Sequence, residues 1–185
     1  MNKAVIIISK ICEIFHWVGC GFLTVCTIAL ITGKEEIISK LTSIKDLNTA
    51  TDIEMYGLSL DPSGSQNLVG AFILFFLSGV IICAIMAMVF RYTNLIFKTA
   101  MGKTSFSEGE TPFQPAIVKM IRRIGWLCIL VPIIELIISC IATVVLGGIE
   151  SSVQMGIIFF GIVILALSRF FAYGVELQKE TEGLV

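Results

Sequence analysis

The chain has 185 residues with a formal net charge of −1, and 56% of them are hydrophobic while only 15% are charged. A mean hydropathy of +0.95 excludes an ordinary soluble domain, whose exposed surface needs many more polar residues. The lack of net positive charge argues against nucleic-acid binding, which depends on basic residues that contact phosphates.

Four apolar segments are each long enough to cross a bilayer, for which a helix needs about 20 residues. They comprise residues 5–31, 68–90, 126–146 and 153–173. The first is about twice as long as a signal-peptide h-region and lacks a small-residue cleavage site, so we interpret it as an uncleaved span. The pattern predicts one all-α integral membrane domain over residues 1–185, folded as an antiparallel four-helix transmembrane bundle.

The distribution of lysine and arginine predicts the orientation in the membrane. Of the thirteen Lys and Arg residues, three lie in the 33–67 loop and six lie from Arg91 to Arg123. Because loops rich in Lys and Arg remain in the cytoplasm, we expect both termini and the 98–125 loop to be cytoplasmic. The 33–67 loop and a tight turn at 147–152 are then expected outside.

The first span carries Cys12, His16 and Cys20 on one helical face. Residues eight apart on a helix are separated by about 12 Å, too far for one metal ion, so we predict no metal site and no cofactor. Glu13 and His16 are three residues apart and can contact each other near the cytoplasmic boundary. All six cysteines lie in or beside the spans, so we expect them to pack rather than form disulfides.

The 33–67 loop combines an amphipathic segment with a turn. Ile37, Leu41, Ile44 and Leu47 recur at helical spacing, which predicts a short extracytoplasmic amphipathic helix. The following Leu-Asp-Pro-Ser-Gly-Ser-Gln-Asn segment is typical of a turn. The sequence leaves open whether this loop senses a ligand or only connects two spans.

Small residues share one helical face in two of the later spans. The faces consist of Gly79, Cys83 and Ala87 in the second span and of Gly161, Ser168 and Ala172 in the fourth. Small side chains let helices approach closely in lipid, where packing drives association, so we expect these faces to contact other helices.

The 98–125 loop is the longest segment that we predict to be cytoplasmic. Gly102 can end the helix that leaves the second span, and Pro112 or Pro115 suits the first turn of the next. That next helix begins as an amphipathic, basic stretch, which suits either an anionic lipid surface or a cytosolic protein partner. The residues expected to make these contacts are Phe106, Phe113, Lys119, Arg122 and Arg123.

The same loop carries Gly109-Glu110-Thr111-Pro112-Phe113, followed eight residues later by Ile-Arg-Arg-Ile-Gly at 121–125. This pattern, placed between the second and third of four spans, resembles an uncharacterised bacterial family of four-span inner-membrane proteins. Members of that family carry a Gly-x-x-Pro-Phe turn and a Leu-Arg-x-Ile-like helix there, and their genes often lie beside one for a small Xre-type helix-turn-helix regulator. The resemblance implies the bacterial cytoplasmic membrane and a link to regulation, but no chemistry.

Glu135 lies about 14 Å along the third span from Trp126, and hence near the midplane of the bilayer. A charge there costs about 2.5–3.5 kcal/mol on insertion scales. Ser139 follows on the same face, and Pro132 can kink the helix nearby. The other side chains considered for this polar site are those of Arg169, Arg91, His16 and Glu13. Glu135 is therefore either a proton or ligand site or a neutral, hydrogen-bonded structural acid.

Motifs of known enzyme classes, such as H-E-x-x-H, G-x-S-x-G and the P-loop, are absent from the sequence. We therefore expect a non-enzymatic bacterial membrane protein that acts as a sensor, regulator or immunity-type partner. The alternative is a small transporter or channel subunit with a polar site around Glu135 and Arg169. That alternative requires homo-oligomers, because one four-helix bundle has little room for a pathway.

Overall fold

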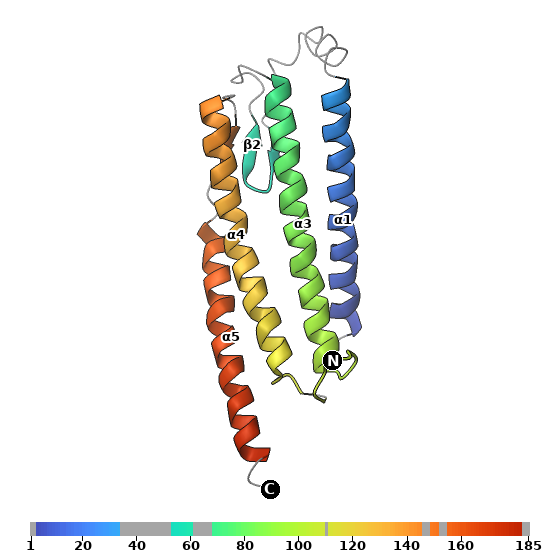
Figure 1. Cartoon of the computed structure of the whole chain (residues 1–185), viewed down its shortest axis with the longest axis vertical. Helices are drawn as coiled ribbons and strands as arrows, with labels where there is room; N and C mark the ends of the chain where they lie inside the picture. The colour runs from blue at the N-terminus through green and yellow to red at the C-terminus, as the bar shows by residue number, and fades with distance from the viewer. Residues whose placement is uncertain are drawn as a thin grey trace. The chain divides into compact units, whose positions relative to one another are not determined.

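The computed structural model describes residues 3–33, 53–60, 68–109, 111–145, 149–151 and 155–182. The elements, in chain order, are α1 (Lys3–Thr32), β1 (Ile53–Met55), β2 (Leu58–Leu60), α3 (Leu68–Ala100), α4 (Pro115–Val145), β3 (Ile149–Ser151) and α5 (Met155–Glu182) (Figure 1). The four helices are all long and apolar enough to cross a membrane. The predicted all-α bundle is confirmed, and the chain is a multi-pass membrane protein.

Three helices extend beyond the apolar segments that predict them. The helix α3 continues to Ala100, α4 begins at Pro115, and α5 continues to Glu182. These extensions are amphipathic rather than uniformly apolar, so a search for long apolar stretches stops before they end. The basic stretch expected before the third span is therefore the first part of α4 itself.

The end of α3 follows from one glycine. Gly102 has a positive φ of 68°, which favours glycine, and its N–H donates to the Thr99 carbonyl at 3.0 Å. The Lys103 N–H donates to the Lys98 carbonyl at 2.9 Å, which completes a Schellman cap. Gly102 therefore ends the helix as the sequence predicts, and Pro115, of the two prolines considered, is the first residue of the next.

The described residues belong to two compact units. Unit 1 comprises residues 1–15, 85–130 and 155–185, and unit 2 comprises residues 16–84 and 131–154. The helices α1, α3 and α4 contribute residues to both units, whereas all of α5 belongs to unit 1. Unit 1 is thus built from four helical segments, and unit 2 from three helical segments and a small sheet.

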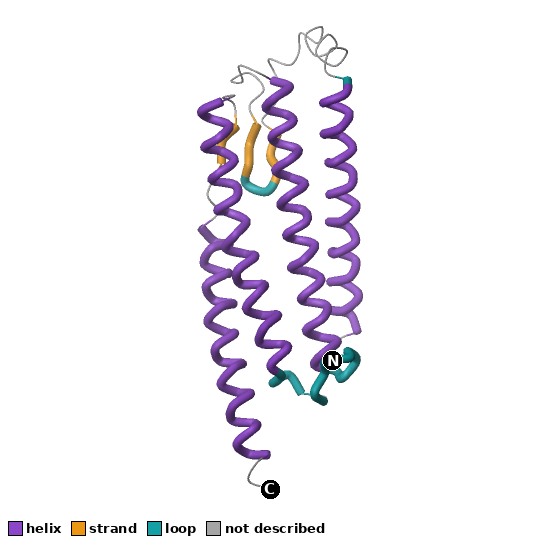
Figure 2. Tube along the Cα trace, viewed as in Figure 1, coloured by secondary structure: helices purple, strands orange, loops and turns teal. Residues whose placement is uncertain are grey.

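The sheet of unit 2 is a feature that the sequence prediction did not contain (Figure 2). Its antiparallel strands β1 and β2 pair Ile53 with Leu60 and Met55 with Leu58. Tyr56 and Gly57 between them have φ of 51° and 84°, the arrangement of a two-residue type I′ hairpin turn. The apolar–polar–apolar pattern of Ile-Glu-Met and Leu-Ser-Leu around Tyr-Gly is the signal that could have revealed the hairpin.

The third strand changes the connection between α4 and α5. The strand β3 pairs antiparallel with β2, with Leu60 opposite Ile149 and Leu58 opposite Ser151. The tight turn predicted at 147–152 thus contains a hydrogen-bonded strand, because the exposed edge of the hairpin offers it main-chain partners. The amphipathic helix predicted around residues 37–47 and the turn at 61–67 lie outside the described residues.

Glycines bring two helices together in unit 1. A Cβ atom on Gly161 of α5 would lie 3.0 Å from the Gly125 carbonyl oxygen of α4, and one on Gly125 would lie 3.1 Å from the Gly161 oxygen. Such backbone contact is the packing that small residues allow in lipid. The face predicted around Gly161 is therefore a helix contact, and its partner Gly125 was not anticipated. Ser168, on the same predicted face, is buried and donates to the Leu165 carbonyl.

Candidate functional site

The residues predicted to form one buried polar site are divided between the two units. Glu135, Ser139 and His16 belong to unit 2, and Glu13, Arg91 and Arg169 belong to unit 1. Arg91 and Arg169 are exposed. Glu13 is buried and forms an ion pair with Lys10, with 2.9 Å between the Lys10 Nζ and the Glu13 Oε2. Within unit 2 the structure describes two polar features, one at Glu135 and one at the tip of the β1–β2 hairpin.

Glu135 is the most unusual polar residue of unit 2. Its side chain is 1% exposed, and neither carboxyl oxygen has a hydrogen-bond partner among the residues that the structure describes. Ser139, one turn further along α4, is half-buried. An unpaired carboxylate in such surroundings is costly, so this side chain is stable there as the neutral acid or with a bound cation.

The second feature of unit 2 is the tip of the β1–β2 hairpin. The Cys83 thiol donates a long hydrogen bond of 3.7 Å to the Tyr56 hydroxyl, and the Tyr56 ring centroid lies 6.4 Å from that of His16. Cys83 is about 22 Å along α3 from Leu68, so the hairpin reaches the middle of that helix. Burial, together with the neighbouring Cys83 thiol, raises the pKa of Tyr56 to about 12, so its hydroxyl keeps its proton at physiological pH.

Unit 1 holds a polar network around Gln114, which the sequence prediction missed. Gln114 is 1% exposed. Its Nε2 lies within hydrogen-bond distance of the Thr99, Gly109 and Thr111 carbonyl oxygens, at 3.3, 2.9 and 2.7 Å. Its Oε1 accepts from the Glu108 N–H at 3.0 Å. One side chain thus ties the end of α3 and the 101–114 loop to the start of α4.

Ser107 extends this network. Its hydroxyl lies 2.8 Å from the Thr99 carbonyl, 2.9 Å from the Gly109 carbonyl and 3.4 Å from the Gln114 Oε1. Thr104 adds a hydrogen bond to the Thr99 hydroxyl at 3.1 Å. One sequence feature could have revealed this network. Gln114 is a polar residue directly before a proline that can start a helix, and it ends a turn rich in Gly, Ser and Thr.

The two phenylalanines predicted for docking have different surroundings. Phe113 is 42% exposed, but its ring lies 5.8 Å from that of Phe171 and fills the space beside Gly174 of α5. Thr111 adds a second link to α5 through its hydrogen bond to Gln178 at 3.2 Å. Phe106 is 45% exposed, slightly more than Phe113, so part of its ring is accessible to another molecule.

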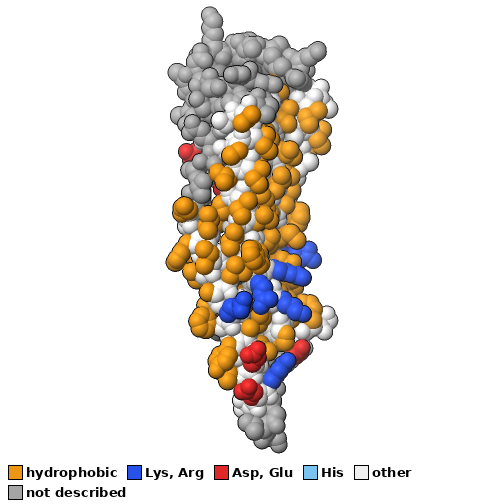
Figure 3. Space-filling model, turned by 60° about the vertical axis from the view of Figure 1, so that its left-hand side comes forward, with side chains coloured by type: hydrophobic (Ala, Val, Ile, Leu, Met, Phe, Trp, Pro, Cys, Tyr) orange, Lys and Arg blue, Asp and Glu red, His pale blue; other side chains and the backbone are white. Residues whose placement is uncertain are grey.

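The predicted basic residues are on the surface of unit 1. Lys119, Arg122 and Arg123 are all exposed on α4, and Figure 3 shows Lys and Arg side chains gathered in a band on the face that it presents. Lys119 and Arg122 border a hollow of about 300 Å³ that Glu176 and Lys179 of α5 also line. These positions fit either use considered for them, an anionic lipid surface or a protein.

Comparisons with protein-family models, with curated proteins and with solved structures find no match to this chain. The functional interpretation therefore depends on the geometry described above.

Proposed function

We propose that this chain is a non-enzymatic regulator of a bacterial cytoplasmic membrane, a sensor or immunity-type protein that acts by binding a cytosolic protein through its 101–114 loop. The observation that carries the proposal is the Gln114 network, which fixes the loop in one shape. A loop that only joins two spans needs no buried amide that both donates hydrogen bonds to its main chain and accepts one from it.

A fixed loop suits protein recognition for an energetic reason. Ordering a loop on binding costs free energy, and a loop that is already ordered avoids this cost. The exposed Phe106 supplies an aromatic anchor of the kind that dominates protein interfaces, and the basic residues of α4 supply charge. Because Phe113 packs on α5, we assign it to holding the surface in shape rather than to contacting the partner.

The proposal requires the 101–114 loop and both termini to be cytoplasmic, as the Lys and Arg distribution predicts. Single cysteines at Ser43 and Ser105, in a cysteine-free background, test this with an impermeant thiol reagent on intact cells. Ser105 is exposed, whereas Ser107 is held in the Gln114 network, so position 105 is the better reporter. Labelling at 43 and protection at 105 are expected, and the reverse pattern overturns the orientation.

Docking is tested by a photo-crosslinking residue at position 106 in cells. We expect one discrete protein adduct, and we expect Gln114→Leu, which releases the loop, to abolish it while the protein remains in the membrane. The control is Ser105→Ala, which leaves the Gln114 network intact and should preserve the adduct. Capture of lipid alone at position 106, or an adduct that persists in Gln114→Leu, contradicts the proposal.

A second candidate function is favoured by Glu135 alone. A fully buried carboxyl group without a partner is the kind of residue that marks a proton or ion pathway in membrane proteins. Under this alternative, a small transporter or channel subunit, reconstituted protein conducts protons or cations across vesicles and Glu135→Gln abolishes the flux. Arg169, the other residue of the predicted pathway, is exposed on α5 in unit 1, so only Glu135 supports this candidate.

A further inference from the structure

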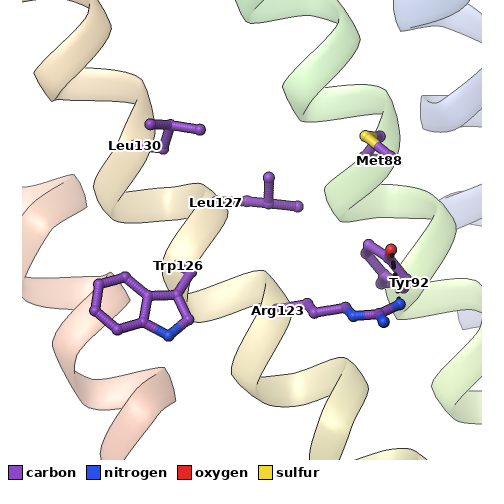
Figure 4. A pocket seen from close by; sticks show the side chains of 6 residues that line it. All are labelled: Met88, Tyr92, Arg123, Trp126, Leu127 and Leu130. Atoms are coloured by element: carbon purple, nitrogen blue, oxygen red, sulfur yellow. Dashed lines mark hydrogen bonds between the residues drawn. The ribbon is translucent and has the colours of Figure 1, made fainter.

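A small pocket lies between α3 and α4 within unit 1 (Figure 4). Its volume is about 310 Å³, and it is open to the surroundings rather than enclosed. The lining side chains are those of Met88, Tyr92, Arg123, Trp126, Leu127 and Leu130. Most of this lining is apolar, and its polar groups are concentrated at Tyr92 and Arg123.

The two helices arrange these side chains in the same order. On α4, Arg123, Leu127 and Leu130 follow at helical spacing, so they share one face and rise by about 10 Å. On α3, Tyr92 and Met88 are four residues apart and also share a face. Both walls of the pocket therefore have a polar end towards the 101–114 loop and an apolar end towards the middle of each helix.

Arg123 is held in position by Tyr92. Its Nη1 donates to the Tyr92 hydroxyl at 3.2 Å, and its Cζ lies 5.6 Å from the centre of the Tyr92 ring. Among the residues that the structure describes, no carboxylate forms an ion pair with Arg123. The guanidinium has five N–H donors, so this contact leaves donors for an anion. The Tyr92 hydroxyl accepts from Arg123, and its own hydrogen remains able to donate.

Trp126 indicates how deep in the membrane this site lies. It is 61% exposed on α4, three residues after Arg123. Exposed tryptophans of membrane proteins favour the interface between headgroups and hydrocarbon. An arginine one turn closer to the loop then lies at the level of lipid phosphates, with the apolar walls at the level of acyl chains.

We propose that this pocket binds one anionic glycerophospholipid. The lipid phosphate accepts hydrogen bonds from the Arg123 guanidinium and the Tyr92 hydroxyl, and an acyl chain lies against Met88, Leu127 and Leu130. Planar guanidinium groups recognise phosphate oxygens with two parallel hydrogen bonds. A zwitterionic headgroup adds a cation next to Arg123, so a headgroup with net negative charge is preferred.

The test measures phosphatidylglycerol and phosphatidylcholine binding to the detergent-purified full chain by native mass spectrometry. Arg123→Gln should weaken phosphatidylglycerol binding about tenfold, a change that corresponds to 1.4 kcal/mol. The matched control is Arg122→Gln, which removes the same charge from the neighbouring residue and should leave this binding unchanged, because Arg122 lines a different hollow. Equal losses in the two variants, or equal affinity of the parent protein for both lipids, overturn the proposal.

Further variants separate the headgroup from the acyl chain. Tyr92→Phe keeps the ring but removes the hydroxyl, and should weaken phosphatidylglycerol binding several-fold. Leu127→Trp fills the apolar end and should abolish binding while Arg123 stays in place; undiminished binding contradicts the assigned acyl-chain position. Inorganic phosphate and glycerophosphoglycerol, at concentrations that match saturating lipid, should not bind. If either binds as tightly as the lipid, the site is an anion site and not a lipid site.

Discussion

The two units differ in whether their buried polar side chains are hydrogen-bonded. In unit 1, the buried Gln114 is surrounded by main-chain partners, and the buried Asn94 donates to the Ile6 carbonyl at 2.8 Å. In unit 2, the main-chain groups of three strands pair with one another, and Glu135 has no partner among the described residues. Gln114 and Asn94 of unit 1 are therefore hydrogen-bonded, whereas unit 2 contains the Glu135 carboxyl group, whose burial without a described partner costs free energy.

The contrast also concerns the backbone. Main-chain groups at membrane depth must be hydrogen-bonded, because hydrocarbon offers them no partners. Unit 1 meets this requirement with helices, and unit 2 meets part of it with the pairing of β1, β2 and β3. The sheet therefore makes non-helical backbone tolerable inside unit 2, and the burial of Leu58 anchors it. The four predictions that follow test this contrast, beginning with the largest expected effect.

The largest effect is expected at the helix contact of unit 1. Gly161→Leu places a side chain against the Gly125 carbonyl and Ile129, and a backbone neighbour cannot move aside cheaply. Overpacking of this kind costs about 1–3 kcal/mol, and we expect the upper end. Thermal unfolding in detergent measures it. The control is Gly156→Leu on the same helix, where an added Cβ meets nothing within 4 Å. Similar losses in both variants contradict close α4–α5 packing.

The next effect concerns the loop of unit 1. Gln114→Leu keeps the approximate size of the side chain but leaves the Glu108 N–H and the Thr111 carbonyl without the hydrogen-bond partner that Gln114 gives them. We expect a loss of about 2 kcal/mol in unfolding free energy, together with faster proteolysis within residues 101–114. Ser105→Ala, at an exposed position of the same loop, should change neither quantity by a measurable amount. A loop that resists protease equally in Gln114→Leu is not held by this network.

In unit 2 the expected effect has the opposite sign. Glu135→Leu removes a buried carboxyl group that has no described partner, so it orphans nothing and should stabilise the protein by about 1–3 kcal/mol. The alternative of a neutral, hydrogen-bonded structural acid instead predicts that Glu135→Leu destabilises the protein, because its polar partners would be left unpaired. Glu135→Gln retains a buried polar group and should unfold much like the parent. Destabilisation by Leu in a thermal unfolding assay shows that Glu135 has a partner after all.

The smallest effect tests the hairpin of unit 2. Gly57 has a φ of 84°, so Gly57→Ala strains the turn and should cost about 1 kcal/mol. The matched control is Gly21→Ala within α1, where an added Cβ meets nothing within 4 Å and a helical alanine is favoured. Unfolding midpoints of the two variants should therefore move in opposite directions. A stabilised Gly57→Ala variant excludes the type I′ turn.

The spans could be predicted because length and hydropathy are properties of contiguous sequence. The end of α3 at Gly102 and the start of α4 at Pro115 were also predictable, since each depends on a local backbone preference. The register of β2 with β3 was not, because it joins segments on either side of two spanning helices. The surroundings of Glu135 and Gln114 depend on how helices rotate and pack, which a single sequence does not specify.

The pairing of β2 with β3 has a consequence for biosynthesis. Spans are synthesised and inserted from the N-terminus, so the residues of the hairpin at 53–60 are made before those of α4. The strand β3 follows α4, and the sheet can only be completed after α4 has entered the membrane. Until then the edge of β2 is unpaired and open to pairing with other chains. Late assembly of the sheet is therefore the step at which slow insertion of α4 would expose this protein to aggregation or to membrane quality-control proteases.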